Sequence, residues 1–156
     1  MKPAIVDGDL LDQEVEAIVN PWNRNVLPWW LLLPAGVAGA IRSRAGLAPF
    51  RELSRHGPIP HGRAVLTTAG RLPHQAIIHV AVLDLLWRAS EDAVRQSVGS
   101  AMTLLSEHHL RSVAFPLLGA GVGGLKPDRA LEIVRESLAP YPESIEARIV
   151  RFLPPA

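Results

Sequence analysis

The chain has 156 residues and a formal net charge of +1 at pH 7, and it contains no cysteine. We expect residues 1–156 to form a single domain, because this length encloses a full hydrophobic core without requiring a second one. The nearly neutral charge provides no broad positive field for nucleic acid. The lack of cysteine excludes disulfides and thiolate chemistry.

The N-terminal part of the chain predicts two short strands and two helices. The apolar run Ala4–Val6 is the first strand, which meets a turn at Asp7-Gly8-Asp9, and Ala17–Asn20 is the second. The small residues of Gly36–Ala45 favour a helix, and Ala48–Arg55 adds a further turn or two of helix before a Gly-Pro pair.

The middle of the chain alternates strands with a long helix. Strands are predicted over Arg63–Ala69 and Ala76–Leu83, and the second is apolar on both faces, as in a central strand of a covered sheet. Ser90 is a suitable N-cap for a helix that extends to about His109. A further strand is predicted over Ser112–Leu118.

A helix over Asp128–Leu138 and a strand over Ala147–Leu153 complete the pattern. Strands that alternate with helices predict an α/β fold, here a three-layer α/β/α sandwich around a mixed, largely parallel central sheet. In such sheets ligands bind beyond the carboxyl ends of the strands. We therefore expect the functional residues in the loops at that edge.

An apolar segment, Trp29–Leu33, lies between Pro28 and Pro34 and is too short to cross a bilayer. The N-terminus also lacks the long apolar core of a signal peptide, so we expect a cytoplasmic protein without membrane contact. Exposed apolar clusters usually mark interfaces. We expect Trp29–Leu33 to pack in the core or to join copies of the chain in a homo-oligomer, in preference to covering a ligand.

The most informative segment is Gly119–Gly124, which carries four glycines. It follows the apolar run Ala114–Leu118 and precedes a helical pattern that begins at Pro127 and Asp128. Glycines leave backbone N–H groups uncovered, and a helix N-terminus adds donors and a positive dipole end. Together these features predict a phosphate-binding loop.

Other residues at strand ends allow two interpretations each. Asp9 can accept hydrogen bonds from an exocyclic amine, or it can cap its own turn. Asn20 and Asn23 can bind sugar hydroxyls, or they can simply terminate a strand. Gly36 and Gly39 can form a second anion cradle at a helix start, or they can permit close packing of the helix on the sheet.

Several other chemistries fit the sequence poorly. The spacing Gly119-x-Gly121-x-x-Gly124 matches the dinucleotide fingerprint, but the next strand ends without the required acidic residue. Leu125 stands where a P-loop requires lysine. The six histidines show no metal-binding spacing, so we predict no metal site. His79 lies within an apolar strand and is expected to be a hydrogen-bonded core residue.

The motifs IVNPWN, GVAGAI, GRAVLTTAG, AIIHV and SVAFPLLGAGVGGLKPDRA follow one another at suitable spacing. In this order they closely resemble the macrodomain family of ADP-ribose-binding modules, from about Val6 to Arg135. The resemblance implies a macrodomain fold and, as ligand, ADP-ribose or an ADP-ribosylated macromolecule, with no cofactor. It also implies that Asp9 contacts the adenine and Asn23 the distal ribose. The implied ligand-binding residues are Gly8, Asp9, Asn20, Asn23, Gly36, Val37, Ala38, Gly39, Leu118, Gly119, Ala120, Gly121, Val122 and Gly123.

Two positions depart from the pattern of the family that the chain resembles. Its well-known hydrolases carry an aspartate where this chain has Ala38. The second loop of many members carries an aromatic residue that stacks near the distal ribose, where this chain has Gly123. We expect these changes to affect catalysis more than binding.

Three functions remain open from the sequence. The first is an enzyme that releases ADP-ribose from a macromolecule or deacetylates O-acetyl-ADP-ribose, with Asn23 as the catalytic residue that orients the ribose for attack by water. The second is a non-catalytic reader of ADP-ribose. The third is a nucleic-acid or polynucleotide binder, against which the nearly neutral charge argues.

Overall fold

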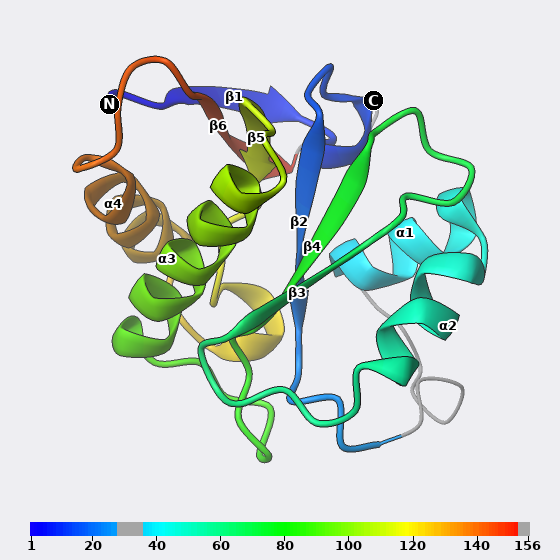
Figure 1. Cartoon of the computed structure of the whole chain (residues 1–156). Coiled ribbons are helices and arrows are strands. Elements are labelled where there is room, and N and C mark those ends of the chain that lie inside the picture. The colour runs from blue at the N-terminus through cyan, green and yellow to red at the C-terminus, as the bar shows by residue number, and fades with distance from the viewer. Residues whose placement is uncertain (28–35, 153–156) are drawn as a thin grey trace.

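The computed structural model describes residues 1–27 and 36–152, and its centre is a six-stranded sheet with the order β1-β6-β5-β2-β4-β3 (Figure 1). The strands are β1 (Ala4–Gly8), β2 (Ala17–Trp22), β3 (Ala64–Thr67), β4 (Ala76–Ala81), β5 (Ser112–Phe115) and β6 (Glu146–Phe152). The helices are α1 (Gly36–Ala45), α2 (Ala48–Arg55), α3 (Glu91–Glu107) and α4 (Pro127–Leu138), with short 3-10 helices η1 (Leu10–Asp12) and η3 (Gly121–Gly123).

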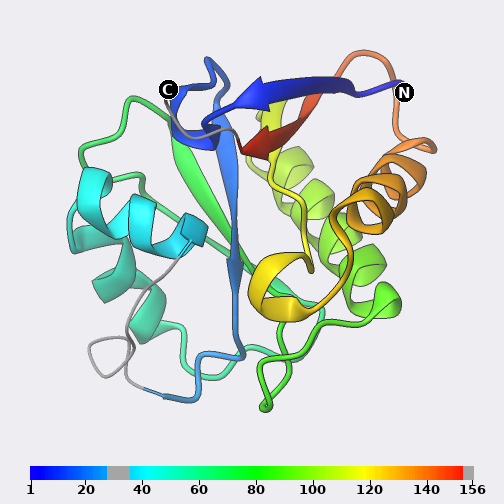
Figure 2. The same cartoon turned by 180° about the vertical axis from the view of Figure 1, so that it is seen from behind.

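The sheet is mixed and largely parallel. Among the described strands, β3 runs antiparallel to its neighbour β4, and every other pair is parallel. Helices α1 and α2 cover one face of the sheet, and α3 and α4 cover the other (Figures 1 and 2). The predicted three-layer α/β/α sandwich is confirmed.

Each face of the sheet has its own apolar layer. Val98 and Leu105 of α3 pack with Ile133 of α4 on one face. On the other face, Ile41 of α1 packs with Phe50 of α2. All six residues of β4 are buried, because both faces of this strand are covered.

The hydrogen-bonded pairing between β2 and β5 is short. Only the pairs Ala17↔Val113 and Ile18↔Ala114 join the two strands, whereas β2 stays paired with β4 as far as Trp22↔Ala81. The carboxyl ends of β2 and β5 therefore separate. This is the place where an open α/β sheet forms a ligand crevice.

Several strand ends at this edge of the sheet differ from the sequence prediction. β4 ends at Ala81 and β5 at Phe115, before the predicted Leu83 and Leu118, because their pairing with neighbouring strands stops there. β1 continues through Asp7 and Gly8, and the turn begins only at Asp9, whose side chain caps η1. β2 extends beyond Asn20 to Trp22, because Pro21 and Trp22 are paired with β4. The predicted role of Trp29–Leu33 in the core or in an oligomer concerns residues that lie outside the described ranges. No helix within those ranges is long and apolar enough to cross a bilayer.

Candidate functional site

A cavity of about 720 Å³ lies at the carboxyl ends of the parallel strands. Its walls come from the end of β2, the start of α1, the segment after β4, the β5–α4 loop and the end of β6. The residues that line it are Pro21, Trp22, Asn23, Gly36, Val37, Ala38, Val82, Leu83, Trp87, Pro116, Leu117, Gly119, Ala120, Gly121, Val122, Gly123, Pro127, Val150, Arg151 and Phe152.

The β5–α4 loop has a backbone that requires glycine. Gly119, Gly121 and Gly124 have φ values of +88°, +65° and +86°, in the left-handed region that side chains disfavour. A Cβ at Gly119 would lie 2.6 Å from Cδ1 of Leu125. The N–H of Leu125 donates to the carbonyl of Gly119 at 2.9 Å, which closes the loop on itself.

Two helices begin at the wall of the cavity. Gly36, Val37 and Ala38 form the first turn of α1, and Pro127 is the first residue of α4. The first turn of α1 contains no acidic residue that would neutralise its positive dipole end, whereas the first turn of α4 contains Asp128, and Pro127 has no backbone N–H to donate. Backbone N–H groups at helix starts favour a bound anion.

The cavity has little side-chain charge of its own. Arg151 is the one charged residue among the described residues that line it. Its Nε donates to Oδ1 of Asp7 at 2.7 Å and its Nη2 to Oδ2 at 3.0 Å, so its charge is already balanced. The start of α1 and the glycine loop are therefore the main source of attraction for a negatively charged ligand.

Asn23 is held at the end of β2 by the residues that follow it. Its Oδ1 accepts a hydrogen bond from the N–H of Asn25 at 2.6 Å, and Asn23 is only 8% exposed. Asn25 has a φ of +59°, and its Nδ2 donates to the carbonyls of Leu53 and Gly57 at 2.9 Å. The turn after β2 is thus tied to α2, and this arrangement fixes Asn23 against the cavity.

Phe152 marks the opposite end of the cavity, near the predicted adenine contact. It pairs with Gly8 in the β1–β6 register, and its side chain is 66% exposed. Asp9 follows Gly8; its Oδ1 accepts from the N–H of Leu11 at 2.8 Å, and its Oδ2 lies 3.7 Å from Nη1 of Arg44. Gly8 and Asp9 do not line the cavity, but they lie beside the residue that closes it.

The family model named Macro domain matches residues 19–134. The chain belongs to the macrodomain family. It is 35% identical to a macro domain-containing protein of Cupriavidus necator, over 95% of this chain and 88% of the relative. It is 33% identical to a Klebsiella pneumoniae protein named O-acetyl-ADP-ribose deacetylase, over 90% and 81% of the two chains. A solved Trypanosoma brucei macrodomain in complex with ADP-ribose superposes with a TM-score of 0.78 and 26% identity, over 97% of this chain and 63% of that one.

The structure brings most of the predicted ligand-binding residues of this macrodomain to one cavity. Those that line it are Asn23, Gly36, Val37, Ala38, Gly119, Ala120, Gly121, Val122 and Gly123. Gly39 lies one residue further along α1, and Leu118 is fully buried beneath the loop.

Asn20 lies inside the sheet, where it belongs to a buried polar chain. Its Nδ2 is 3.0 Å from Nδ1 of His79, and Nε2 of His79 is 2.8 Å from Oγ1 of Thr67. Thr67 donates its hydroxyl proton to the carbonyl of Thr68, so the imidazole must donate from Nε2 and accept at Nδ1. Burial lowers the pKa of His79 from 6.5 to about 3, with a smaller contribution from the charge of His56. His79 is a neutral core residue, as its position in an apolar strand predicts.

Sequence reasoning missed several walls of the cavity. Val150 and Phe152 belong to β6, which was predicted as a strand but could not be placed beside β1 and β5 without the strand order. Trp87 lies in the loop between β4 and α3 and carried no local signal of its own. The left-handed φ of Trp87, +62°, is visible only in the structure.

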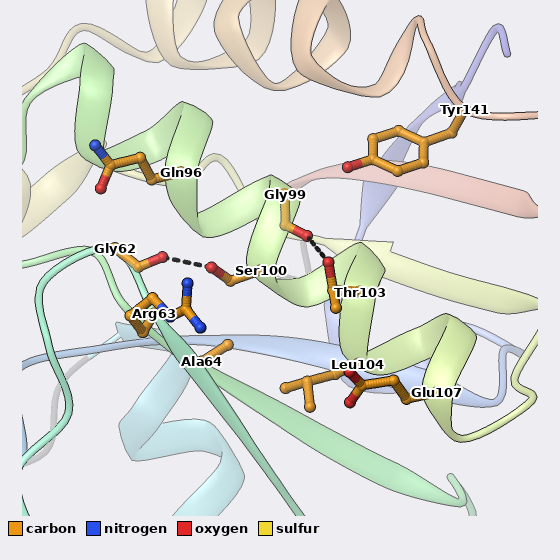
Figure 3. A pocket seen from close by; sticks show the side chains of 10 residues that line it. All are labelled: Gly62, Arg63, Ala64, Gln96, Gly99, Ser100, Thr103, Leu104, Glu107 and Tyr141. Atoms are coloured by element: carbon orange, nitrogen blue, oxygen red, sulfur yellow. Dashed lines mark hydrogen bonds between the residues drawn. The ribbon is translucent and has the colours of Figure 1, made fainter.

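A second hollow, of about 500 Å³, lies over α3 and differs in its chemistry (Figure 3). Two of its hydroxyls are engaged within the protein: Ser100 donates to the carbonyl of Gly62 at 2.7 Å, and Thr103 donates to that of Gly99 at 3.0 Å. The lining residues of α3 lie between Gln96 and its last residue, Glu107, so this hollow does not contain the start of the helix. The cavity at the strand ends is the better candidate for an anionic ligand.

Proposed function

We propose that this macrodomain binds ADP-ribose, either free or attached to a macromolecule. The observation that carries the proposal is the convergence of two backbone features on one cavity: the start of α1 and the glycine loop Gly119–Gly124. A diphosphate is the anion that these features suit, because backbone donors and helix dipoles bind phosphate without requiring a cation.

The sheet order gives the bound ligand a direction. The cavity extends across the carboxyl ends of β6, β5, β2 and β4 in this order. In our proposal the diphosphate lies in the middle, between Gly36 and Gly121, and the adenine packs on Phe152 with Asp9 near its amine. The distal ribose then lies at the other end, where Asn23 contacts its hydroxyls.

Two relatives support this assignment. The Trypanosoma brucei macrodomain, which shares the fold over nearly the whole of this chain, was solved with ADP-ribose. The Klebsiella pneumoniae relative bears the name of an enzyme that acts on O-acetyl-ADP-ribose. The two names concern ADP-ribose and its O-acetyl derivative, which share the diphosphate that we assign to the backbone donors of the cavity.

Hydrolysis at the distal ribose is the second candidate function, and the name of the Klebsiella relative favours it. No described residue that lines the cavity is a carboxylate or a histidine, and Ala38 lies in the first turn of α1. A catalytic reaction would therefore rely on Asn23 to orient the ribose and on a water molecule positioned beside the diphosphate. We place binding first because it requires none of the missing groups.

Isothermal titration calorimetry with ADP-ribose, ADP and AMP tests the proposal. We expect ADP-ribose to bind most tightly and AMP most weakly. Phe152→Ala should weaken all three ligands, whereas Asn23→Ala should weaken ADP-ribose alone. Arg63→Ala, in the second hollow, is the matched control and should change nothing. Equal affinity for AMP and ADP-ribose would refute the assignment, and release of acetate from O-acetyl-ADP-ribose would decide in favour of the enzyme.

A further inference from the structure

The loop that follows β4, Asp84–Ala89, presents large apolar side chains to solvent. Leu85 and Leu86 are 60% and 66% exposed, and Trp87 is 38% exposed while it lines the cavity. The other described tryptophan of the cavity, Trp22, is only 5% exposed and packs on Phe50 at 5.6 Å between ring centroids. Of the two described tryptophans that line the cavity, Trp87 is therefore the more accessible to a ligand.

Trp87 lies at the end of the cavity that holds Asn23. The N–H of Leu83 donates to the carbonyl of Trp22 at 3.2 Å, so the loop starts beside the end of β2. At its other end, the N–H of Ala89 donates to the carbonyl of Gly123 at 3.0 Å. Phe152 belongs to β6, and β5 and β2 separate it from β4. Trp87 and Phe152 thus close opposite ends of the cavity.

Position 123 of the glycine loop has little room for a side chain. A Cβ at Gly123 would lie 2.9 Å from Cβ of Ala89 and 3.4 Å from Cδ2 of Leu83. The Asp84–Ala89 loop occupies the space into which a side chain at position 123 would extend. Among the described residues near this end, Trp87 of the Asp84–Ala89 loop is the aromatic residue that lines the cavity and remains accessible.

The loop holds Trp87 in a fixed and strained conformation. Trp87 has a φ of +62°, which costs a non-glycine residue about 1 to 2 kcal/mol. Oδ1 of Asp84 accepts from the N–H groups of Leu86 and Arg88 at 2.8 and 2.9 Å, and the N–H of Trp87 donates to the carbonyl of Asp84 at 3.1 Å. Strain that is held by such a network is typical of a functional position.

We infer that Trp87 packs the face of its indole ring against the distal ribose and thereby selects ADP-ribose over ADP. The inference rests on the proposed function, because it assumes that the distal ribose lies beside Asn23. Aromatic rings offer sugars a flat apolar surface, and ligand cavities commonly use one to fix orientation. In this inference the Asp84–Ala89 loop supplies the aromatic contact that Gly123 does not.

The test compares the affinities for ADP-ribose and ADP by calorimetry. Trp87→Ala should reduce the affinity for ADP-ribose by about 10-fold and leave that for ADP unchanged, while Trp87→Phe should retain most of the preference. Trp87→Asn provides a second variant whose side chain tolerates the left-handed backbone. Leu86→Ala is the matched control, because Leu86 belongs to the same loop but does not line the cavity, and it should keep both affinities.

The outcomes separate this inference from the proposed function. If the unaltered protein binds neither ADP nor ADP-ribose, the proposed function fails. If it binds both and Trp87→Ala, with an unchanged thermal unfolding profile, keeps the same ratio of affinities, the role of Trp87 is wrong. Equal weakening of ADP and ADP-ribose by both Trp87→Ala and Trp87→Asn would also overturn it, because the ring would then support the cavity as a whole.

Discussion

The two glycine segments beside the cavity are held in different ways. At Gly119 a Cβ would lie 2.6 Å from Cδ1 of Leu125 and 2.9 Å from Cγ2 of Val94. At Gly36 no described atom lies within 4 Å of the corresponding position, although its φ of +58° is also left-handed. The β5–α4 loop is fixed by its contact with the core, whereas the start of α1 depends on the handedness of its backbone.

This contrast separates two reasons for a glycine. One is close approach, where a β-carbon would have to displace a neighbour, and the other is a backbone conformation that a β-carbon disfavours. In this macrodomain the loop with the greater number of glycines also has the stronger packing requirement.

Gly119→Ala should have the largest effect of the changes considered. The free energy of unfolding should fall by about 3 to 4 kcal/mol, which combines the left-handed backbone with overpacking against Leu125. Urea denaturation measures this loss. Gly124→Ala is the matched control, because its φ of +86° is similar but no atom lies within 4 Å. It should lose only about 1 to 2 kcal/mol, and equal losses would contradict the packing explanation.

Acid should weaken the sheet on which both segments rest. Below pH 6.5 the unfolded chain protonates His79, whereas the folded chain resists protonation until about pH 3, because burial lowers the pKa of this residue. The stability that His79 contributes is complete above pH 6.5 and is lost as the pH falls toward 3, on the order of 3 kcal/mol by about pH 4.

Urea denaturation of the unaltered protein and of His79→Gln, at neutral and at acid pH, checks this expectation. The variant should lose stability less steeply with acid, because glutamine does not titrate. Parallel losses in the two proteins would assign the acid sensitivity to other groups. A His79 imidazole that protonates near pH 6.5 by NMR would do the same.

Gly123→Ala should have an intermediate effect, because this glycine is packed without a left-handed backbone. A β-carbon would approach that of Ala89 to 2.9 Å, and we expect a loss of about 1 to 2 kcal/mol in unfolding free energy. Ala89→Gly removes the opposing methyl group. The double variant should therefore recover most of the loss in a double-mutant cycle, and strict additivity of the two changes would show that they do not touch.

Gly36→Ala should have the smallest effect on stability. The cost is the left-handed backbone alone, about 1 kcal/mol, and thermal unfolding followed by circular dichroism would measure it. The affinity for ADP-ribose should fall as the first turn of α1 adjusts. A loss as large as that of Gly119→Ala would remove the contrast between the two segments.

Local signals predicted the helices and the fold class well. Helices α1 and α2 have the predicted bounds: Gly46 follows α1 directly, and Gly57 follows His56, the C-cap of α2. The strand ends were harder: pairing with β4 extends β2 to Trp22, and this places Asn20 inside the sheet beside His79. The residue at which a strand ends depends on the strand that pairs with it, and this partner cannot be identified from the sequence of one strand alone.

The walls of the cavity show the same limit of local reasoning. The glycine loop and Asn23 carry recognisable patterns, and both reach the cavity. Phe152 reaches the cavity because of the strand order, and Trp87 reaches it because of the conformation of the Asp84–Ala89 loop. Residues that depend on long-range arrangement carry no pattern of their own in one sequence.

The short hydrogen-bonded pairing between β2 and β5 divides the sheet into two three-stranded halves. Two residue pairs join them, and beyond Ile18 and Ala114 the ladder stops. The proposed ligand would lie across this seam, touching the loop after β5 on one side and the end of β2 on the other. A ligand bound there would bridge the two halves of the sheet where backbone pairing between β2 and β5 is absent. Occupancy of the cavity should therefore oppose separation of the two halves.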